Sequence, residues 1–407
     1  MRCTACPVPN DFPCLGQTQT FLCGRAAQGE PGFRSALYRT AVAASQGAGF
    51  TADAGRMKVG IVTPGCFVGG AEMWMLALLR GCDHRQLTWH GVAVVYPQHV
   101  YPPMADEMAR YCPVARGPAA LDQLYAECDV VILWGVAAYD QRIPPRPRRS
   151  RIVMVSHGIG PWTARVFDGA ANADAWVAVS SAALGPIPEP YRSRAVVIHN
   201  GVERGRLVPR IGRNEQRERW GVARDRKVLG YLGRLSDEKN PKALAEAVAA
   251  LPGKWVGVQV GDGLGVEGVT AHARATAPGR VYHPGATNDI GSALAAFDEM
   301  LLPSHEEACS LTCLEAWTAG VPLIATPVGL VPEYPDLVRI IPCGATGKQI
   351  AAAVLADAND PNGTRERTRS ARAIAREQFS APVFAANWTR YLVALAPQNS
   401  LVGSAHG

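Results

Sequence analysis

Hydrophobic and polar positions alternate along the chain in two blocks of short apolar runs separated by amphipathic segments. The first block opens with KVGIVTP at 58–64 and continues with WHGVAVVYP, DVVILWG, RIVMVSHG, AWVAVS and AVVIHNGV. These runs are rich in Val and Ile without strict alternation, which is typical of strands buried on both faces of a parallel sheet. GAEMWMLALLRG and ALDQLYAE, which lie between them, have the spacing of helices.

The second block repeats this pattern after residue 226. Its apolar runs are KVLGYLGRL, WVGVQVGDG, RVYHP, DEMLLP, PLIATP and VRIIP. NPKALAEAVAAL predicts a helix with Asn240 as N-cap and Pro241 at its first position. Residues 203–226, between the blocks, are polar and rich in Arg, which is typical of a link between domains. We therefore predict an α/β protein with two doubly wound, Rossmann-like domains that face a cleft.

The C-terminal region has helical spacing, and its last segment is amphipathic. In PVFAANWTRYLVALA the apolar residues recur at helical intervals: Val383, Phe384, Trp388, Tyr391, Leu392 and Leu395. Because such a face needs a surface to cover, we predict that this helix crosses back to pack on the first domain. The predicted boundaries are a first domain at 57–205, a second at 206–378, the returning helix at 379–396 and a tail at 397–407.

Residues 1–56 stand outside the two blocks and are rich in Gly, Gln, Ser and Pro. Three interpretations are open: a poorly structured extension, a metal-binding segment, or a native chain that begins at Met57. The metal interpretation depends on Cys3, Cys6, Cys14 and Cys23. A single CxxC pair without a second is weak evidence for zinc, so metal binding is the least favoured of the three.

Composition narrows the class of protein. With 48% hydrophobic and 19% charged residues in 407, the chain has a soluble, globular balance and enough length for two domains. It has no run of about 18 uncharged apolar residues and no pattern of a signal peptide, so we expect a cytoplasmic protein. Seven of its 11 cysteines lie in apolar segments, as reduced core thiols do: Cys66, Cys82, Cys112, Cys128, Cys309, Cys313 and Cys343.

The net charge of +6 is small for this length, and the one notable feature of the charge distribution is a local cluster of arginines. QRIPPRPRRSR at 141–151 contains five arginines, within 142–151. A solvated loop is the favoured interpretation. The alternative is contact with a polyanion or with the surface of an anionic membrane.

Three segments that follow predicted strands carry candidate chemistry, because ligands of such sheets bind at the carboxyl ends of strands. TPGCFVGGAE places Gly69 and Gly70 at the start of a helix, where backbone amides can approach a phosphate. LGRLSDEKN places Arg234 and Lys239 in one loop, within reach of one diphosphate. Each segment also has a bland interpretation, a tight turn for the glycines and solvated surface charge for the cations.

The third segment is EEACSLTCLEAWTAGVPLIAT at 306–326. Ser310 is the predicted N-cap of a helix at 311–319, so that Glu307 lies in the loop and Glu315 within the helix. A carboxylate in such apolar surroundings needs a partner, which is either a ligand hydroxyl or a neighbouring Arg. Together the three segments describe a cleft for a nucleotide diphosphate linked to a group rich in hydroxyls.

Five motifs of the sequence resemble those of the retaining GT-B glycosyltransferases of family 4. The third segment resembles their E-x7-E signature, and GRLSDEKN resembles their Arg…Lys diphosphate motif. VGGAE is similar to their N-terminal glycine loop, VVIHNGVE to their VIPNGVD junction, and ATPVGLVPE to their ATxVGGxPE segment. The five motifs occur in the family's order and cover about residues 57–396.

The resemblance implies transfer of a hexose or N-acetylhexosamine from a UDP- or GDP-linked donor, with retention and without an obligatory metal or other cofactor. Arg234 and Lys239 would stabilise the diphosphate leaving group. Glu315 would accept hydrogen bonds from the ribose, and Glu307 would hold hydroxyls of the donor sugar. The remaining implied donor contacts are the backbone around Cys309, Ser310 and Leu311 and the glycine loop at Gly69 and Gly70.

Two histidines and two departures from the family's motifs also bear on the predicted site. The resemblance gives His157 a place facing the transferred sugar, with a loop-capping role as the alternative. His199 stands where the family usually has proline, and we expect a structural role for it. Ala308 and Ser310 stand where the family often has glycines, which leaves the identity of the sugar open.

The motifs do not identify the acceptor molecule to which the sugar would be transferred. We expect a hydroxyl on a glycan, a small molecule or a lipid-linked compound, with modified nucleic acid less favoured. The first domain offers Trp74, Trp134 and Trp162 for stacking on a sugar, although core packing is the commoner use of tryptophan. The competing functions are a GT-B-fold UDP-sugar epimerase and a nucleotide-sugar-binding protein without catalysis.

Overall fold

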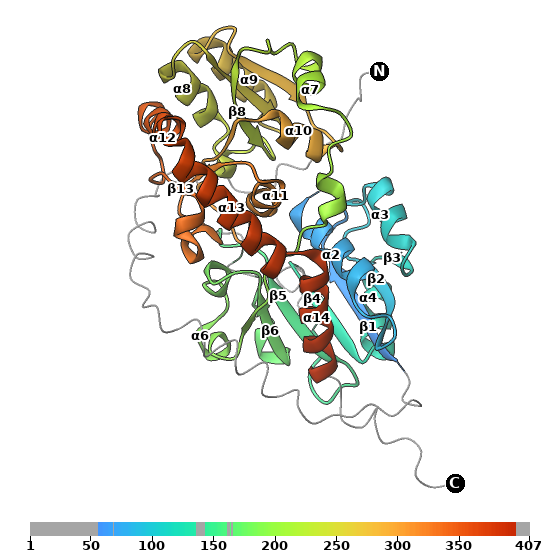
Figure 1. The fold of residues 1–407 in the computed structure, drawn as a ribbon. Coiled ribbons are helices and arrows are strands. Elements are labelled where there is room, and N and C mark those ends of the chain that lie inside the picture. Colours follow the sequence, from blue (N-terminus) through green and yellow to red (C-terminus); the bar gives the residue numbers. More distant parts are fainter. Residues whose placement is uncertain (1–55, 68, 136–142, 161–162, 164–165, 396–407) are drawn as a thin grey trace, which may run out of the picture.

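The computed structural model describes residues 56–67, 69–135, 143–160, 163 and 166–395, which form two domains around two parallel sheets (Figure 1). Within those residues the first sheet has seven strands in the order β3-β2-β1-β4-β5-β6-β7. Their bounds are Met57–Thr63 for β1, Leu87–Val94 for β2, Val114–Arg116 for β3, Val130–Trp134 for β4, Arg151–Ser156 for β5, Ala175–Ala178 for β6 and Val196–Val197 for β7. Its helices are α2 at Gly70–Gly81, α3 at Pro102–Ala109, α4 at Pro118–Glu127 and α6 at Glu189–Arg192.

The second sheet has six strands among the described residues, in the order β10-β9-β8-β11-β12-β13. They are β8 at Lys227–Leu232, β9 at Trp255–Val260, β10 at Val281–Gly285, β11 at Glu299–Leu302, β12 at Leu323–Ala325 and β13 at Arg339–Ile340. Its helices are α7 at Arg213–Arg219, α8 at Lys242–Ala250, α9 at Val266–Thr276, α10 at Ile290–Ala296, α11 at Leu311–Ala319, α12 at Gly347–Asn359 and α13 at Pro361–Gln378. The predicted α/β architecture of two doubly wound domains is confirmed.

The apolar runs become strands because helices cover both faces of each sheet. Every residue of β9 and of β11 is buried, including Gln259 and Glu299. Such strands cannot show the alternation of a sheet with one wet face, which explains the continuous apolar pattern. Six of the predicted core thiols are buried as expected: Cys66, Cys82, Cys112, Cys128, Cys309 and Cys313.

Of the two predicted helix N-caps, the one at Ser310 is confirmed and the one at Asn240 is wrong. Helix α11 has the predicted bounds, and the Ser310 side chain caps it by accepting a hydrogen bond from the Cys313 backbone N–H. Asn240 is not the N-cap of α8. It adopts a left-handed conformation with φ 48° after a short 3-10 turn, η6 at Asp237–Lys239. Its side-chain amide donates to the Pro303 carbonyl, so Asn240 ties this loop to the end of β11 instead.

The chain passes between the domains through residues 198–226. This segment contains a 3-10 turn, η5 at Arg204–Leu207, and helix α7, which packs on α10 of the second domain. Sequence reasoning assigned no helix here, because α7 is held by charge and not by an apolar face. Arg213 and Arg217 each lie 2.7 Å from a different carboxylate oxygen of Asp298.

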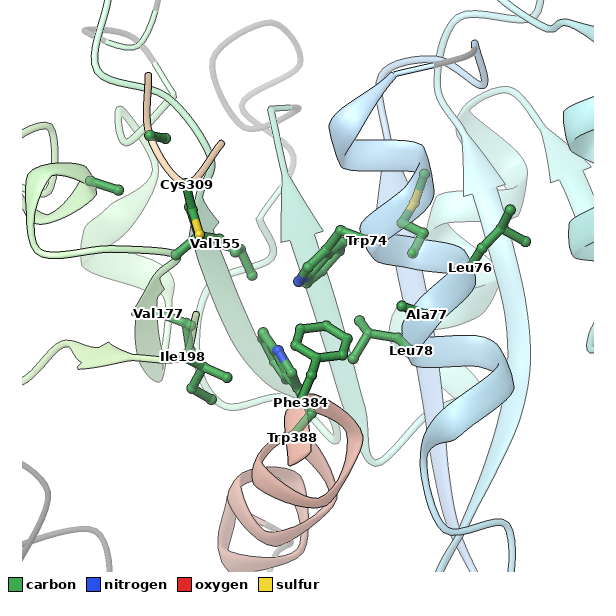
Figure 2. Packing of buried hydrophobic residues seen from close by; sticks show 14 of the residues in the cluster. Trp74, Leu76, Ala77, Leu78, Val155, Val177, Ile198, Cys309, Phe384 and Trp388 are labelled. Atoms are coloured by element: carbon green, nitrogen blue, oxygen red, sulfur yellow. The ribbon is translucent and has the colours of Figure 1, made fainter. Parts of the chain in front are cut away.

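The last helix, α14 at Ala381–Leu395, returns to the first domain and packs on α2, which confirms the predicted crossing (Figure 1). Its return is fixed by a bridge between Val202 and Ser380. Figure 2 shows Phe384 and Trp388 pointing toward Trp74 and Leu78 of α2. Phe384 and Trp388 are at most 1% exposed, and the rings of Trp74 and Trp388 meet edge to face at 5.5 Å.

Three of the four described arginines of the cluster are more than half exposed, as a solvated loop predicts, but all four are paired with carboxylates. Arg148 is buried and pairs with Asp174, while Arg146 and Arg151 also contact that carboxylate. Arg149 lies 3.3 Å from Asp129. The cluster precedes β5, at the amino edge of the first sheet, so it lies across that sheet from the loops that carry the candidate site. This placement does not favour recruitment of a polyanion to the cleft.

Some predictions fall outside the described residues. These are the N-terminal cysteines Cys3, Cys6, Cys14 and Cys23, the tail after residue 396, Arg142 and Trp162. Within the described ranges, no helix combines the length and apolar character needed to cross a membrane.

Candidate functional site

The predicted site residues gather where three loops leave the carboxyl ends of central strands. In the first sheet the strand order reverses between β1 and β4, and in the second between β8 and β11. Such reversal points are where doubly wound sheets open a crevice for ligands. The glycine loop follows β1, the loop with Arg234 and Lys239 follows β8, and the loop with Glu307 follows β11.

Lys239 and Glu307 form an ion pair across two of these loops. The Lys239 Nζ lies 2.8 Å from Glu307 Oε1, and the Ser304 hydroxyl donates to the same oxygen at 2.9 Å. The side chains are 23% and 10% exposed, so the pair is shielded but open on one side. Because β8 and β11 are neighbours in the sheet, residues 68 positions apart meet here.

Arg234 lies in the same loop but is far more exposed. Its guanidinium donates to Glu238 at 3.0 Å, and the Ser236 hydroxyl donates to the same carboxylate oxygen. Arg234 also acts across the domains on Glu72, in the first turn of α2. Burial raises the pKa of Glu72, and the field of Arg234 opposes that rise.

The glycine loop faces the start of α11. A side chain built on Gly70 would meet the Leu311 side chain at 3.8 Å, which places the two loops against each other. Gly69 is the N-cap of α2 and supplies no side-chain cap. At α2 the buried Glu72 carboxylate accepts from the Phe67 backbone N–H at 3.4 Å, and at α11 the Ser310 hydroxyl accepts from that of Cys313. The other amides of these two helix starts remain available to a phosphate.

The turn before α11 is anchored to the first domain. The buried Asn200 side-chain amide donates to the Cys309 carbonyl at 3.0 Å. Beside it, His199 Nε2 lies 2.9 Å from Glu333 Oε2, and the other Glu333 oxygen accepts from the Ser181 backbone N–H at 2.8 Å. The predicted structural role of His199 therefore has a partner in the second domain. Glu333 belongs to the ATPVGLVPE segment.

Glu315 is buried inside α11, as its sequence context predicts. Burial raises the pKa of its carboxyl to about 7, against the field of Arg206. Arg206 lies on η5 with its Nη1 3.7 Å from Glu315 Oε1. Of the two partners that the sequence left open, a neighbouring Arg is present.

His157 follows β5 and sits between two tryptophan rings. The Trp74 and Trp134 rings meet it edge to face, with centroids 4.5 Å and 5.4 Å away. Its Nε2 is shielded from solvent and has no hydrogen-bond partner within the described residues. Burial lowers the pKa of His157 to about 3, so the imidazole is neutral near pH 7.

Two of the three tryptophans proposed for the acceptor, Trp74 and Trp134, have other contacts in the structure. Trp74 is 1% exposed, and the Trp134 indole N–H donates to the Thr63 hydroxyl at 3.0 Å. A different aromatic residue is exposed beside the glycine loop, Phe67, whose ring packs 5.5 Å from that of His99. Sequence reasoning missed Phe67 and Arg206, which do not stand out in composition or spacing, and it assigned no role to Glu333 although the ATPVGLVPE motif ends there.

Metal-type clusters give no further candidate. Among the residues that the structure describes, no group of three or more His, Cys, Asp or Glu side chains is placed to hold a metal ion.

Comparison with known proteins relates part of the chain to glycosyltransferases. Residues 212–340 match the family model of glycosyl transferases group 1. Among curated proteins, the chain is 32% identical over 155 residues to the D-inositol 3-phosphate glycosyltransferase of Actinosynnema mirum and 30% identical over 152 residues to that of Mycolicibacterium smegmatis. These matches cover 34% and 35% of this chain and only 37% and 34% of the relatives.

Solved structures are similar over most of the chain. The complex of Anabaena HepE with UDP and glucose has a TM-score of 0.72 at 20% identity, covering 83% of this chain and 99% of that one. WaaG, a glycosyltransferase involved in lipopolysaccharide biosynthesis, has a TM-score of 0.60 at 16% identity, with coverage of 85% and 100%. At these identities the likeness concerns the fold alone, and this chain has the GT-B fold.

Proposed function

We propose that this protein is a retaining glycosyltransferase. It moves a hexose or N-acetylhexosamine from a nucleotide-diphospho-sugar to a hydroxyl acceptor. The observation that carries this proposal is the Lys239–Glu307 pair at the carboxyl edge of the second sheet, opposite the glycine loop at Gly70. A cation and a carboxylate side by side suit a ligand that joins a diphosphate to a ring of hydroxyls. The match of residues 212–340 supports the same class of enzyme.

The nucleotide lies on the second domain in this proposal. Glu315 accepts hydrogen bonds from the ribose, and the amides at Cys309, Ser310 and Leu311 face the phosphates at the start of α11. UDP is the first nucleotide to test, because structures of Anabaena HepE hold UDP, alone or with glucose, and UDP-glucose.

The proposed chemical step uses charge and not a protein nucleophile. The bond between the anomeric carbon and the diphosphate oxygen breaks, and Arg234 and Lys239 stabilise the negative charge that develops there. The acceptor oxygen attacks from the same face, and its proton passes to the departing phosphate. Retention follows from attack on that face. No metal has a part in the step.

His157 and Glu307 position the sugar. Glu307 accepts hydrogen bonds from its hydroxyls, while the neutral His157 brings from the first domain its Nε2, for which the described residues supply no partner. A neutral imidazole can donate or accept one hydrogen bond without adding charge beside the reacting carbon.

The acceptor is a hydroxyl of a glycan, a small molecule or a lipid-linked compound, bound on the first domain. The competing functions, an epimerase and a binding protein without catalysis, predict different products. A thermal-shift screen of UDP- and GDP-sugars first selects the donor. The selected donor is then incubated with the enzyme in water. A transferase releases nucleotide and free sugar by slow hydrolysis, an epimerase yields an altered nucleotide-sugar, and a binder returns the donor unchanged.

A further inference from the structure

The Glu315 carboxylate is buried, and the described residues supply it with an ion pair but no hydrogen bond. Its side chain is 7% exposed, and within the described part of the chain no donor reaches either of its oxygens at hydrogen-bond distance. A buried polar group left in this state requires an explanation, since the great majority are paired. Arg206, at 3.7 Å, balances the charge while the carboxylate lone pairs remain available.

Arg206 is the charged residue that the surroundings of Glu315 supply. Helix α10 and strand β12, which pack beside α11, contain no charged residue. Helix α13 also packs on α11, but its Arg372 lies against Gly320, at the far end of that helix. On α11 itself Glu315 is the single charged side chain.

The turn that carries Arg206 is held from both domains. A side chain on Gly291 would come within 2.7 Å of the Leu207 backbone, so α10 and η5 are in close backbone contact. The Ser292 hydroxyl accepts from the Arg210 and Ile211 amides at 2.9 Å and 3.0 Å, which fixes the chain after the turn. Before the turn, Glu203 accepts from Arg80 of α2 at 2.8 Å.

We propose that Arg206 is a positioning residue that favours the charged form of the Glu315 carboxylate and orients it to accept both hydroxyls of the donor's ribose. This inference rests on the proposed function, because it gives Glu315 the ribose. Arginine suits the role, since a guanidinium stays protonated under all relevant conditions. At 3.7 Å it compensates the charge and leaves the oxygens free for the ligand.

The test compares two nucleotides on matched variants by isothermal titration. UDP carries both ribose hydroxyls, and 2′,3′-dideoxyuridine diphosphate carries neither. Arg206→Gln removes the cation, Arg206→Lys keeps it, and Arg204→Gln makes the same change at an exposed position on the same turn. Circular dichroism verifies that each variant is folded.

The inference predicts that Arg206→Gln weakens UDP binding about tenfold or more near pH 7 and leaves dideoxy-UDP binding unchanged. Arg206→Lys restores part of the loss, and Arg204→Gln binds as the wild type does. The loss in Arg206→Gln should also shrink as pH rises, because removing the cation raises the pKa of Glu315 and ionisation then needs a higher pH.

Two results would overturn the inference alone: unchanged UDP affinity in Arg206→Gln, or an equal loss for both nucleotides, which would indicate a merely structural role. If the wild type binds neither UDP nor GDP, the proposed function fails, and this inference fails with it. The two failures are therefore distinguishable by the wild-type titration.

Discussion

The Lys239 Nζ lies 2.8 Å from Glu307 Oε1, so the cation proposed for the diphosphate and the carboxylate proposed for the sugar form an ion pair. The pair joins the loops after β8 and β11. A donor must share or replace this contact, because its phosphate competes for the cation while its hydroxyls compete for the carboxylate.

Glu307→Gln should separate binding of the nucleotide from turnover. The change keeps the size of the side chain and removes its charge, so Lys239 no longer has a competing carboxylate. We expect the affinity for UDP to stay equal or increase. The activation free energy of turnover should rise by about 2–4 kcal/mol, which lowers the rate roughly 30- to 1000-fold. Titration with UDP and initial rates of donor hydrolysis measure the two effects.

The control for this prediction is Glu306→Gln, the same change one residue earlier, where the contact with Lys239 uses the backbone carbonyl. It should leave both quantities near wild type. Loss of UDP binding in Glu307→Gln, or wild-type turnover, would contradict the proposed role of Glu307.

In the folded protein His157 should remain neutral at pH values far below the ordinary pKa of histidine. Burial lowers that pKa from 6.5 to about 3, so below pH 6.5 the unfolded chain takes up a proton that the folded chain does not. The free energy of unfolding should therefore decrease as pH falls from 6.5 toward 3, by on the order of 2 kcal/mol at about pH 5 from this group.

Urea titrations of the wild type and His157→Asn across this pH range measure the effect, with the exposed His84→Gln as control. The His157 variant should lose part of the acid dependence and the control should keep it. A His157 imidazole that protonates near pH 6.5, seen in its NMR titration, would show the burial argument to be wrong.

His199 and Glu333 should couple the stability of the two domains. Burial opposes the charge of Glu333, but the hydrogen bonds and charge of His199 and the hydrogen bonds of Ser181 together outweigh it and lower the pKa of Glu333 below 4.5. The stabilisation from ionised Glu333 is present above pH 4.5 and is lost as the pH falls through the lowered pKa of Glu333. A double-mutant cycle of His199→Asn and Glu333→Gln should give a coupling of about 1–3 kcal/mol near neutral pH. Additive effects of the two changes would contradict the pairing.

Arg148 and Arg149 should behave differently although they are neighbours. Arg148→Gln removes the most shielded of the three arginines that contact Asp174, together with its hydrogen bonds to the Pro144 and Asn172 carbonyls, and should cost about 1–3 kcal/mol of unfolding free energy. Arg149→Gln breaks an exposed pair with Asp129 and should cost about 0–1 kcal/mol.

The same exposed variant tests the polyanion interpretation. If the cluster recruits an anionic acceptor, the KM for that acceptor rises steeply with salt and Arg149→Gln flattens the rise. We expect the variant to leave the salt dependence unchanged, since the arginines are paired with carboxylates at the amino edge of the sheet.

Elements with strong local signals could be predicted from the sequence. Helix α11 has a serine cap, a glycine stop and an apolar body, and both of its bounds were predicted. Helix α14 could be oriented because its apolar face needs a partner. The error at Asn240 arose because its side chain bonds to Pro303, 63 residues away, and no local pattern reports such a contact.

Pairings between distant charges could not be predicted for the same reason. The sequence places Arg234, Lys239, Glu307 and Glu315 in the right loops or helix, but not their partners. Arg206 reaches Glu315 only because the linker turn is fixed on α10, and Arg148 reaches Asp174 only through the folded sheet edge. Such contacts depend on tertiary geometry, whereas strand and helix positions depend on periodicity.

The most direct test of the account is the anomeric configuration of the product and its dependence on Lys239. The α-linked donor selected by the screen is incubated with methanol as a small acceptor, because a methyl glycoside keeps its configuration for NMR. Wild type, Lys239→Met and Lys254→Met are compared, the last being an exposed lysine at the opposite edge of the second sheet. The account predicts the methyl α-glycoside, formed at wild-type rate by Lys254→Met and about 100-fold more slowly by Lys239→Met. A β-glycoside, or equal rates in all three proteins, would contradict it.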